Sequence, residues 1–335
     1  MDSFAAAPAR SLRIVLAGGS GQLGTVLARH FHERGHHVTV LTRSPYTAPW
    51  LTVRWDVDPD LWTDFIEGAN VCINLAGSSL NCRWDHRNRA QILASRLDAT
   101  RLLAQVIARL SSPPQIWMNA STASIYRHSL DEEMDEESEL GGHERIRHFP
   151  FGWWPAPKNW TFFTLAAQQV ETAFFASPTP RTRKIALRSA AVMSPAPGSA
   201  FGRLSNLVRM GLGGTLGSGR QYVAWIHESD FARAVEFLID HDEVEGSVNL
   251  AAPNPLPNRE FMAALREAWQ RPNGLPAPAL VVKLAAWLLG VNSEALLKSR
   301  CVIPGRLLDA GFAFKFPRWP EAAEDLAQQW RRREG

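Results

Sequence analysis

The stretch LRIVLAGGSGQLGTVLARHFHER, residues 12–34, carries the strongest structural signal in this chain. It predicts an apolar, β-branched strand over residues 12–17, a glycine-rich turn over 18–24, and an amphipathic helix from there to Arg34. A strand that passes through glycines directly into a helix is the opening unit of a nucleotide-binding α/β sheet. We therefore interpret the remaining segments as candidates for a parallel sheet.

Gly18, Gly21 and Gly24 of this turn have the spacing G-x-x-G-x-x-G. This spacing allows a tight turn, lets the backbone approach a pyrophosphate, and permits close packing of the helix against the strand. The N-terminus of the helix then presents unpaired N–H groups and the positive end of its dipole to the phosphates. The pattern predicts a dinucleotide-binding site, with a glycine-rich turn that binds nothing as the alternative interpretation.

A second strand is expected over residues 38–41, and the residues at its end indicate the type of dinucleotide. An acidic side chain there would bind the ribose 2′-hydroxyl of NAD(H). The chain instead has Thr42, Arg43 and Ser44, which suit a 2′-phosphate. The sequence therefore favours NADP(H), although a solvated surface arginine is the alternative interpretation of Arg43.

Further strands alternate with helices along the first half of the chain. Apolar runs predict strands near residues 51–55, 70–75 and 116–120, and a long helix is expected over 86–110. Such alternation implies a parallel sheet covered on both faces, so the predicted fold class is α/β, a doubly wound, Rossmann-like parallel sheet. Ligands of such sheets bind at the carboxyl ends of the strands, where the small turn NLAG, residues 74–77, would lie.

Composition and charge exclude other classes of protein. The 335 residues carry 36 basic and 33 acidic side chains, and the net charge of +3 is too small and scattered to indicate a nucleic-acid partner. The three cysteines have neither CxxC spacing nor a histidine at a metal-ligand interval, so no metal site is expected.

The sequence also gives no indication of a membrane partner. The apolar stretch 277–291 is interrupted by Lys283 and is shorter than the roughly 20 residues that span a bilayer. Residues 1–10 lack the long apolar core of a secretory signal and are expected to form a flexible tail. A cytoplasmic location is the resulting expectation.

Several phrases of the chain together resemble the extended short-chain dehydrogenase/reductase superfamily. Within it, the chain is most similar to an atypical branch, the epimerase family proteins, which end in a domain of unknown function. The resemblance spans nearly the whole chain and is more specific in its middle and C-terminal phrases than in the glycine turn. The phrases are GGSGQLG (18–24), NLAG followed by Arg83 and Trp84, ILASRLDATRLL (92–103), LRSAAV (187–192), GGTLGSGRQYVAWIHESD (213–230), GSVNLAAPNPLPNREF (246–261) and LLKSRCVIPGRLLDAGFAFKFP (296–317).

The resemblance implies a division of the chain into two lobes. Residues 11–195, together with 221–252, would form the NADP-binding Rossmann domain of the extended short-chain dehydrogenase type. Residues 196–220 and 253–335 would form a smaller C-terminal substrate lobe folded over it. A long segment, residues 130–160, is acidic at first and then rich in Arg, His and Trp, and its length is typical of a lid over the active-site edge.

The resemblance also implies a set of cofactor contacts. Four of the implied contact residues also have structural interpretations: Leu75, Ala76 and Val192 would be apolar core in any such sheet, and Arg96 could equally be a cation on a helix surface. The implied contacts are Gly18, Gly21, Gln22, Leu23 and Gly24 to the pyrophosphate, Thr42 and Arg43 to the 2′-phosphate, Leu75 and Ala76 at the fourth strand, Gln91 and Arg96 from the following helix, and Val192 beside the nicotinamide.

The usual proton relay of the superfamily, Tyr-x-x-x-Lys, is absent. The resemblance places Phe163 and Ala167 at these two positions, and neither side chain can move a proton. The remaining candidates follow the fifth strand: Ser121 or Thr122 to polarise a carbonyl, and Tyr126 as an acid if its pKa were depressed. The alternative interpretation is that the Ser and Thr hydroxyls only cap the end of the strand.

Three side chains farther along have structural interpretations beside functional ones. Asp230 is expected to be the N-cap of a helix that runs to Leu238. By the resemblance, Arg188 and Arg220 would point toward the cleft between the lobes, where they would bind an anionic substrate. A buried ion pair is the alternative for Arg188.

Together these expectations favour an NADP(H)-binding oxidoreductase or epimerase-like enzyme that acts on a small polar carbonyl or sugar-like substrate. The alternative is a catalytically silent NADP(H)-sensing protein that binds a protein partner. The missing proton relay favours the sensor, and the substrate lobe that the resemblance implies favours the enzyme.

Overall fold

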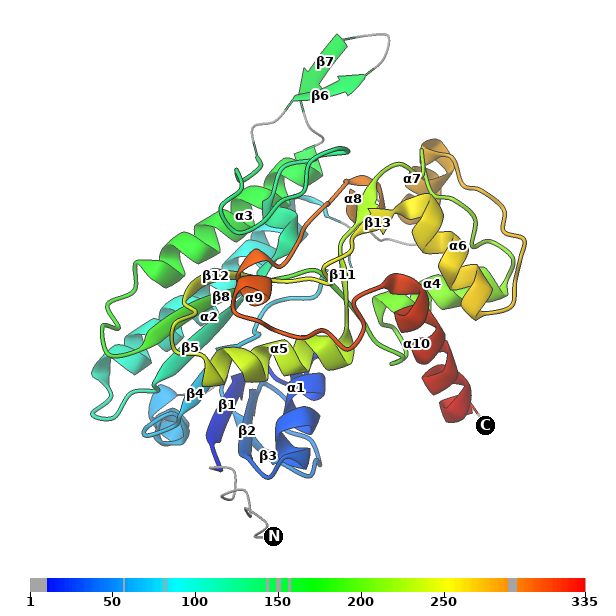
Figure 1. The fold of residues 1–335 in the computed structure, drawn as a ribbon. Coiled ribbons are helices and arrows are strands. Elements are labelled where there is room, and N and C mark those ends of the chain that lie inside the picture. The colour runs from blue at the N-terminus through cyan, green and yellow to red at the C-terminus, as the bar shows by residue number, and fades with distance from the viewer. Residues whose placement is uncertain are drawn as a thin grey trace.

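The computed structural model describes residues 11–56, 58–80, 82, 84–142, 145–148, 152–155, 158–288 and 294–334. Seven strands form one parallel sheet in the order β12-β8-β5-β4-β1-β2-β3 (Figure 1). The predicted fold class is therefore confirmed, while the predicted tail 1–10 and Arg83 lie outside the described residues. The strands are β1 (Arg13–Ala17), β2 (His37–Thr42), β3 (Leu51–Arg54), β4 (Val71–Asn74), β5 (Ile116–Thr122), β8 (Arg183–Ser189) and β12 (Gly246–Leu250).

Helices cover both faces of this sheet (Figure 1). On one face, α1 (Gln22–Glu33) and α5 (Glu228–Asp240) bury Leu27, Phe31, Val235 and their neighbours against Ile14 and Leu16 of β1. On the other face, α2 (His86–Arg109) and α3 (Lys158–Phe175) pack on the opposite side chains of the same strands. Successive side chains of a strand point to opposite faces, so an uninterrupted apolar strand supplies both cores.

The C-terminal part has its own aromatic core, built by α4 (Ala200–Arg209), α6 (Asn258–Ala268) and α10 (Trp319–Glu334). The ring of Trp319 stacks on Phe261 with centroids 4.0 Å apart and meets Trp225 edge-on at 5.0 Å. The other elements are η1 (Pro59–Leu61), η2 (Thr63–Phe65), η3 (Ala123–Ile125), β6 (Arg145–His148), β7 (Gly152–Pro155), β9 (Ala191–Met193), β10 (Tyr222–Val223), β11 (Trp225–His227), β13 (Leu256–Pro257), α7 (Ala279–Leu288), α8 (Glu294–Leu297) and α9 (Gly305–Asp309).

Asp230 does not cap α5, so that prediction is wrong. The N-cap is His227, whose Nδ1 accepts the N–H of Ser229 at 3.1 Å. Asp230 lies in the first turn of α5, three residues after the cap, and is fully buried; its carboxylate accepts the backbone N–H groups of Lys315 at 2.9 Å and Phe316 at 2.7 Å. It therefore ties the start of α5 to the segment that leads into α10.

The acidic first part of the expected lid is fixed to the body of the protein. Met134 exchanges backbone hydrogen bonds with the segment that precedes α9: its N–H donates to Cys301 O at 2.7 Å, and its carbonyl accepts from Ile303 N at 2.9 Å. Glu136 is buried against the edge strand β12. This part of the segment completes the sheet edge, so the lid prediction is wrong for it. Residues 143 and 144 lie outside the described residues, and β6 and β7 form a separate hairpin (Figure 1).

Within the described part of the chain, no helix has the combination of length and apolarity needed to cross a membrane.

Candidate functional site

The protein's own packing requires glycine at positions 18 and 24 of the turn between β1 and α1. Gly18 has φ +73°, and a Cβ added to it would lie 2.5 Å from Cα of Ala76 in the loop after β4. A Cβ on Gly24 would lie 2.3 Å from the backbone of Gly19. Any side chain at either position would therefore push the turn away from the sheet or from the helix.

Gly21 is different, because a Cβ there would meet only the carbonyl oxygen of Gly18, at 3.9 Å. The protein itself leaves this space open. Gly21 is also the N-cap of α1, provides no side-chain cap, and precedes a first turn without acidic residues. The open side and the free N–H groups fit a bound anion such as a pyrophosphate. Gln22 is exposed at this end of α1, whereas Leu23 packs partly into the core.

The end of β2 lies beside this turn. The buried hydroxyl of Thr42 is 3.0 Å from Ser20 Oγ, and Arg43 is exposed next to it. Ser20 was not among the predicted residues. Its position within the glycine turn could have suggested it, but its proximity to Thr42 depends on how the turn folds back over β2. Thr42, Arg43 and Ser20 together form a polar corner suited to a phosphate.

Hydrogen bonds from side chains and backbone hold the loop after β4 in place. Asn74 Oδ1 accepts the N–H of Ala76 at 3.1 Å, and Leu75 N donates to Ala17 O at 2.8 Å. Arg96 of α2 donates to Ser78 O at 3.1 Å, and burial lowers its pKa. Arg96 is thus a support for this loop rather than a surface cation.

The two other predicted cofactor contacts lie in contrasting surroundings. Gln91 is exposed on α2, and Val192 is buried on β9. A cofactor contact by either residue stays a prediction.

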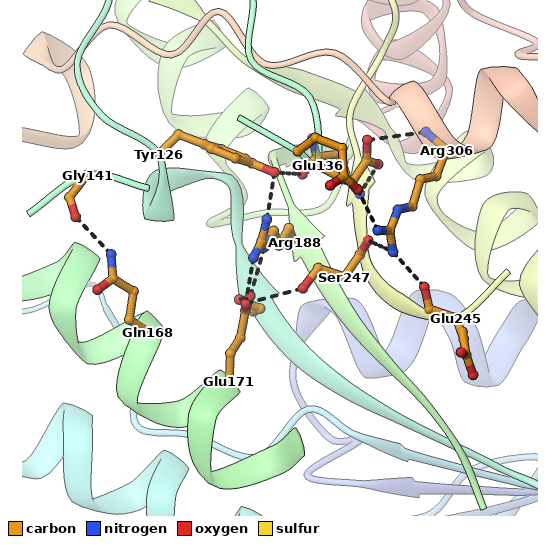
Figure 2. Close-up of polar contacts among 12 residues, drawn as sticks. Tyr126, Glu136, Gly141, Gln168, Glu171, Arg188, Glu245, Ser247 and Arg306 are labelled. Carbon is orange, nitrogen blue, oxygen red and sulfur yellow. Dashed lines mark hydrogen bonds and ion pairs between the residues drawn. The ribbon is translucent and has the colours of Figure 1, made fainter. Parts of the chain in front are cut away.

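Figure 2 shows polar contacts that join Glu171, Arg188 and Tyr126, all of which are buried. Glu171 of α3 and Arg188 of β8 form a two-pronged ion pair, with Nε to Oε1 at 3.0 Å and Nη2 to Oε2 at 2.8 Å. Ser121 donates its hydroxyl to Glu171 Oε1 at 2.5 Å. The ion-pair interpretation of Arg188 is therefore correct, while Arg220 is exposed. The network reaches the end of β5 at Ser121.

Tyr126 also belongs to this network and is fully buried. Its hydroxyl accepts from Arg188 Nη1 at 2.9 Å and donates to Asn249 Oδ1 at 2.8 Å. Burial raises the pKa of Tyr126 to about 12, against the smaller opposing effect of Arg188. The depressed pKa that its predicted acid role requires is therefore contradicted.

The neighbouring hydroxyl, that of Thr122, accepts the N–H of Ser124 at 3.1 Å and caps η3. The capping interpretation is correct for Thr122 but does not describe Ser121. On α3, Phe163 packs against Trp84 with ring centroids 5.1 Å apart, and Ala167 packs against the buried cluster that contains Tyr126. Phe163 and Ala167 thus lie among apolar side chains, whereas Glu171, one turn further along α3, carries a buried charge.

One polar contact near the site was missed entirely. The buried ammonium of Lys298 donates to Tyr126 O at 2.7 Å, to Ser124 O at 3.1 Å and to Thr164 Oγ1 at 3.0 Å. It connects the C-terminal part to the turn after β5. The phrase LLKSRC contains it, but no local pattern indicates a partner more than 130 residues away.

Two family profiles match the chain. The NAD dependent epimerase/dehydratase family matches residues 14–147, and a domain of unknown function, DUF1731, matches residues 277–326. The chain is 32% identical over 322 residues to the epimerase family protein SDR39U1 of Mus musculus, covering 94% of this chain and 99% of that protein.

Solved structures agree with these matches. The crystal structure of human epimerase family protein SDR39U1 (isoform 2) with NADPH superposes with a TM-score of 0.80 at 29% identity, covering 95% of this chain and 99% of that chain. The UDP-N-acetylglucosamine 4-epimerase of Bacillus cereus superposes with a TM-score of 0.72 at 16% identity over 96% of this chain and 100% of that chain, which shows a common fold.

Proposed function

Because the chain belongs to the NAD dependent epimerase/dehydratase family, among the epimerase family proteins that carry a DUF1731 domain, we propose that it binds NADPH between β1 and α1. The similar human protein was crystallised with NADPH. The observation that carries the proposal is Gly21, where the protein's own packing leaves room for a side chain but none is present.

The residues around this turn fit the parts of the cofactor. The uncapped N-terminus of α1 would hold the pyrophosphate, and Thr42, Arg43 and Ser20 would surround the 2′-phosphate. Asn74 and Arg96 hold the loop that contains Leu75 and Ala76. These two residues would line the cofactor between the pyrophosphate and Val192. When bound, the nicotinamide would supply hydride transfer.

We further propose an oxidoreductase or epimerase-like reaction on a small polar carbonyl or sugar-like substrate. With Phe163 and Ala167 in place of a Tyr–Lys pair and Tyr126 held in the protein interior, the hydroxyls of Ser121 and Thr122 are the candidate polar groups at the carboxyl end of β5. Thr122 uses an oxygen lone pair to cap η3, which leaves its hydrogen to donate to a substrate oxygen.

Calorimetry tests the cofactor proposal with the wild type and Arg43→Ala. We expect NADPH to bind the wild type at least tenfold more tightly than NADH, and Arg43→Ala to remove most of this preference, since a charged hydrogen bond contributes about 1.5–3 kcal/mol. Arg29, an exposed cation of α1, provides the matched control Arg29→Ala. Equal affinities for the two cofactors in the wild type would contradict the 2′-phosphate assignment.

A sensor that binds a protein partner is the second candidate, and the absence of a Tyr-x-x-x-Lys pair from the sequence favours it. NADPH oxidation should be followed with a panel of aldehydes, ketones and nucleotide sugars. Oxidation with any of these that is lost in the Ser121→Ala/Thr122→Ala variant would support the enzyme. NADPH-dependent capture of a partner without any oxidation would support the sensor.

We propose that residues 11–195 and 221–252 form the cofactor-binding domain and that residues 196–220 and 253–335 form the substrate lobe. The separate aromatic core around α4, α6 and α10 supports it.

A further inference from the structure

We propose that Glu171 positions the Ser121 hydroxyl as a hydrogen-bond acceptor, so that the substrate group bound at Ser121 is a donor, a hydroxyl or an amine. This inference rests on the proposed function for the location of the site. It assigns Glu171 as a positioning residue that acts through Ser121. It also narrows the substrate class from carbonyl compounds in general to those that carry an O–H or N–H group at this point.

The hydrogen bonds of the Glu171 carboxylate carry the argument. Oε1 accepts from Ser121 Oγ at 2.5 Å and from Arg188 Nε at 3.0 Å. Oε2 accepts from Arg188 Nη2 at 2.8 Å and from Ser247 Oγ at 3.3 Å. An ionised carboxylate is an acceptor only, with about four lone-pair sites, so all four are used and each neighbour must donate. The hydrogen of Ser121 is therefore directed at Glu171, whose contacts with Arg188 and Ser247 are drawn in Figure 2.

The ionised state follows from the partner of Glu171. Arg188 stays charged, is buried like Glu171, and meets the carboxylate with both arms of its guanidinium. Its remaining amino group donates to Tyr126, which is held in turn by Asn249. These buried contacts fix the orientation of the pair, so the carboxylate cannot turn away from Ser121.

Only the lone pairs of Ser121 remain for the substrate. Ser121 is partly exposed, whereas Glu171 and Arg188 are each 6% exposed, so the network reaches the end of β5 through this oxygen. A hydroxyl that donates to a carboxylate is polarised and becomes a stronger acceptor. Thr122 has the opposite polarity, because its oxygen accepts from Ser124 and its hydrogen is left to donate.

The direction of the hydrogen bond at each hydroxyl can be tested by replacing the hydroxyl with a thiol. In a Cys82→Ser background, Ser121→Cys and Thr122→Cys are alkylated with iodoacetamide across a pH series, with Glu171 present and in Glu171→Gln. Native Cys72 and Cys301 are buried, and burial raises their pKa to about 12 and about 11, so they do not interfere. The carboxylate should hold the pKa of the Cys at 121 at least one unit above its value in Glu171→Gln, a tenfold change in thiolate below both pKa values.

Thr122→Cys is the matched control. The pKa of its thiol should differ by less than a third of a unit between the protein with Glu171 and Glu171→Gln. Glu171→Asp keeps a charge beside Arg188 while withdrawing it from residue 121, so it should give an intermediate pKa even if Glu171→Gln folds poorly. The same pKa at 121 with Glu and Asp at 171 would overturn the inference. NADPH binding is measured on the same proteins, and its absence in the wild type would instead refute the proposed function.

Discussion

Glu136 Oε1 accepts the backbone N–H of Asn249 at 2.8 Å, on the side of β12 that has no neighbouring strand. The other carboxylate oxygen accepts the N–H of Arg306 at 3.2 Å, and the Arg306 side chain donates to the carbonyls of Glu245 and Ser247 (Figure 2). An unpaired strand edge is a template for aggregation. Two charged side chains close it here.

The first prediction concerns Glu136→Gln. An amide has one oxygen, so either the Asn249 or the Arg306 N–H loses its acceptor and faces an NH₂ group. We expect a loss of about 1–3 kcal/mol in the free energy of unfolding, measured with urea. Glu139→Gln, at an exposed position of the same segment, is the control. Equal stability of the two variants would show that Glu136 does not hold this edge.

The pH dependence of the same residue gives a second prediction. Burial raises the pKa of Glu136 above its ordinary value of 4.5, against weaker lowering by its backbone hydrogen bonds. The native state therefore binds this proton more tightly than the unfolded chain does, and the resulting contribution to stability is complete below pH 4.5 and is lost as pH rises through the folded pKa. The stability of the wild type relative to Glu136→Gln should fall over this window. A difference that grows with pH would contradict the raised pKa.

The third prediction separates burial from pairing at Glu171 and Arg188. Glu171→Met leaves a buried arginine uncompensated and should destabilise the protein by about 3–5 kcal/mol. Removing the partner as well, in Glu171→Met/Arg188→Met, should recover most of this loss, because an apolar pair avoids desolvation of two charges. Thermal unfolding of Glu171→Met, Arg188→Met and the double variant gives the coupling energy. Additive losses would mean that the ion pair is not the source of the effect.

The fourth prediction compares two glycines of one turn. Gly21→Ala meets no atom of the protein closer than 3.9 Å, so we expect its stability to change by less than about 0.5 kcal/mol while NADPH affinity falls at least tenfold. Gly24→Ala places a Cβ 2.3 Å from the Gly19 backbone and should destabilise the fold by several kcal/mol. Melting curves with and without NADPH distinguish the two effects. A Gly21→Ala protein that binds NADPH normally would remove the main support for the cofactor site.

The sequence by itself determined the doubly wound sheet and the turn between β1 and α1. Strand, glycines and helix follow one another within residues 12–34, and their periodicity and turn residues act over only a few positions. The position of Thr42 and Arg43 beside this turn could be predicted for the same reason, since they stand at the end of β2, while their contact with a cofactor stays a prediction.

Only the tertiary structure decided the roles of Asp230, Tyr126 and Glu171. A polar side chain has no preferred partner until the fold brings one near: Asp230 met two N–H groups some 85 residues away instead of capping α5, and Tyr126 was buried against Arg188. Ser121 became the end of a charged network because β5, β8 and α3 converge there. Hydrogen-bond direction depends on burial and on long-range neighbours, and neither is encoded in local spacing.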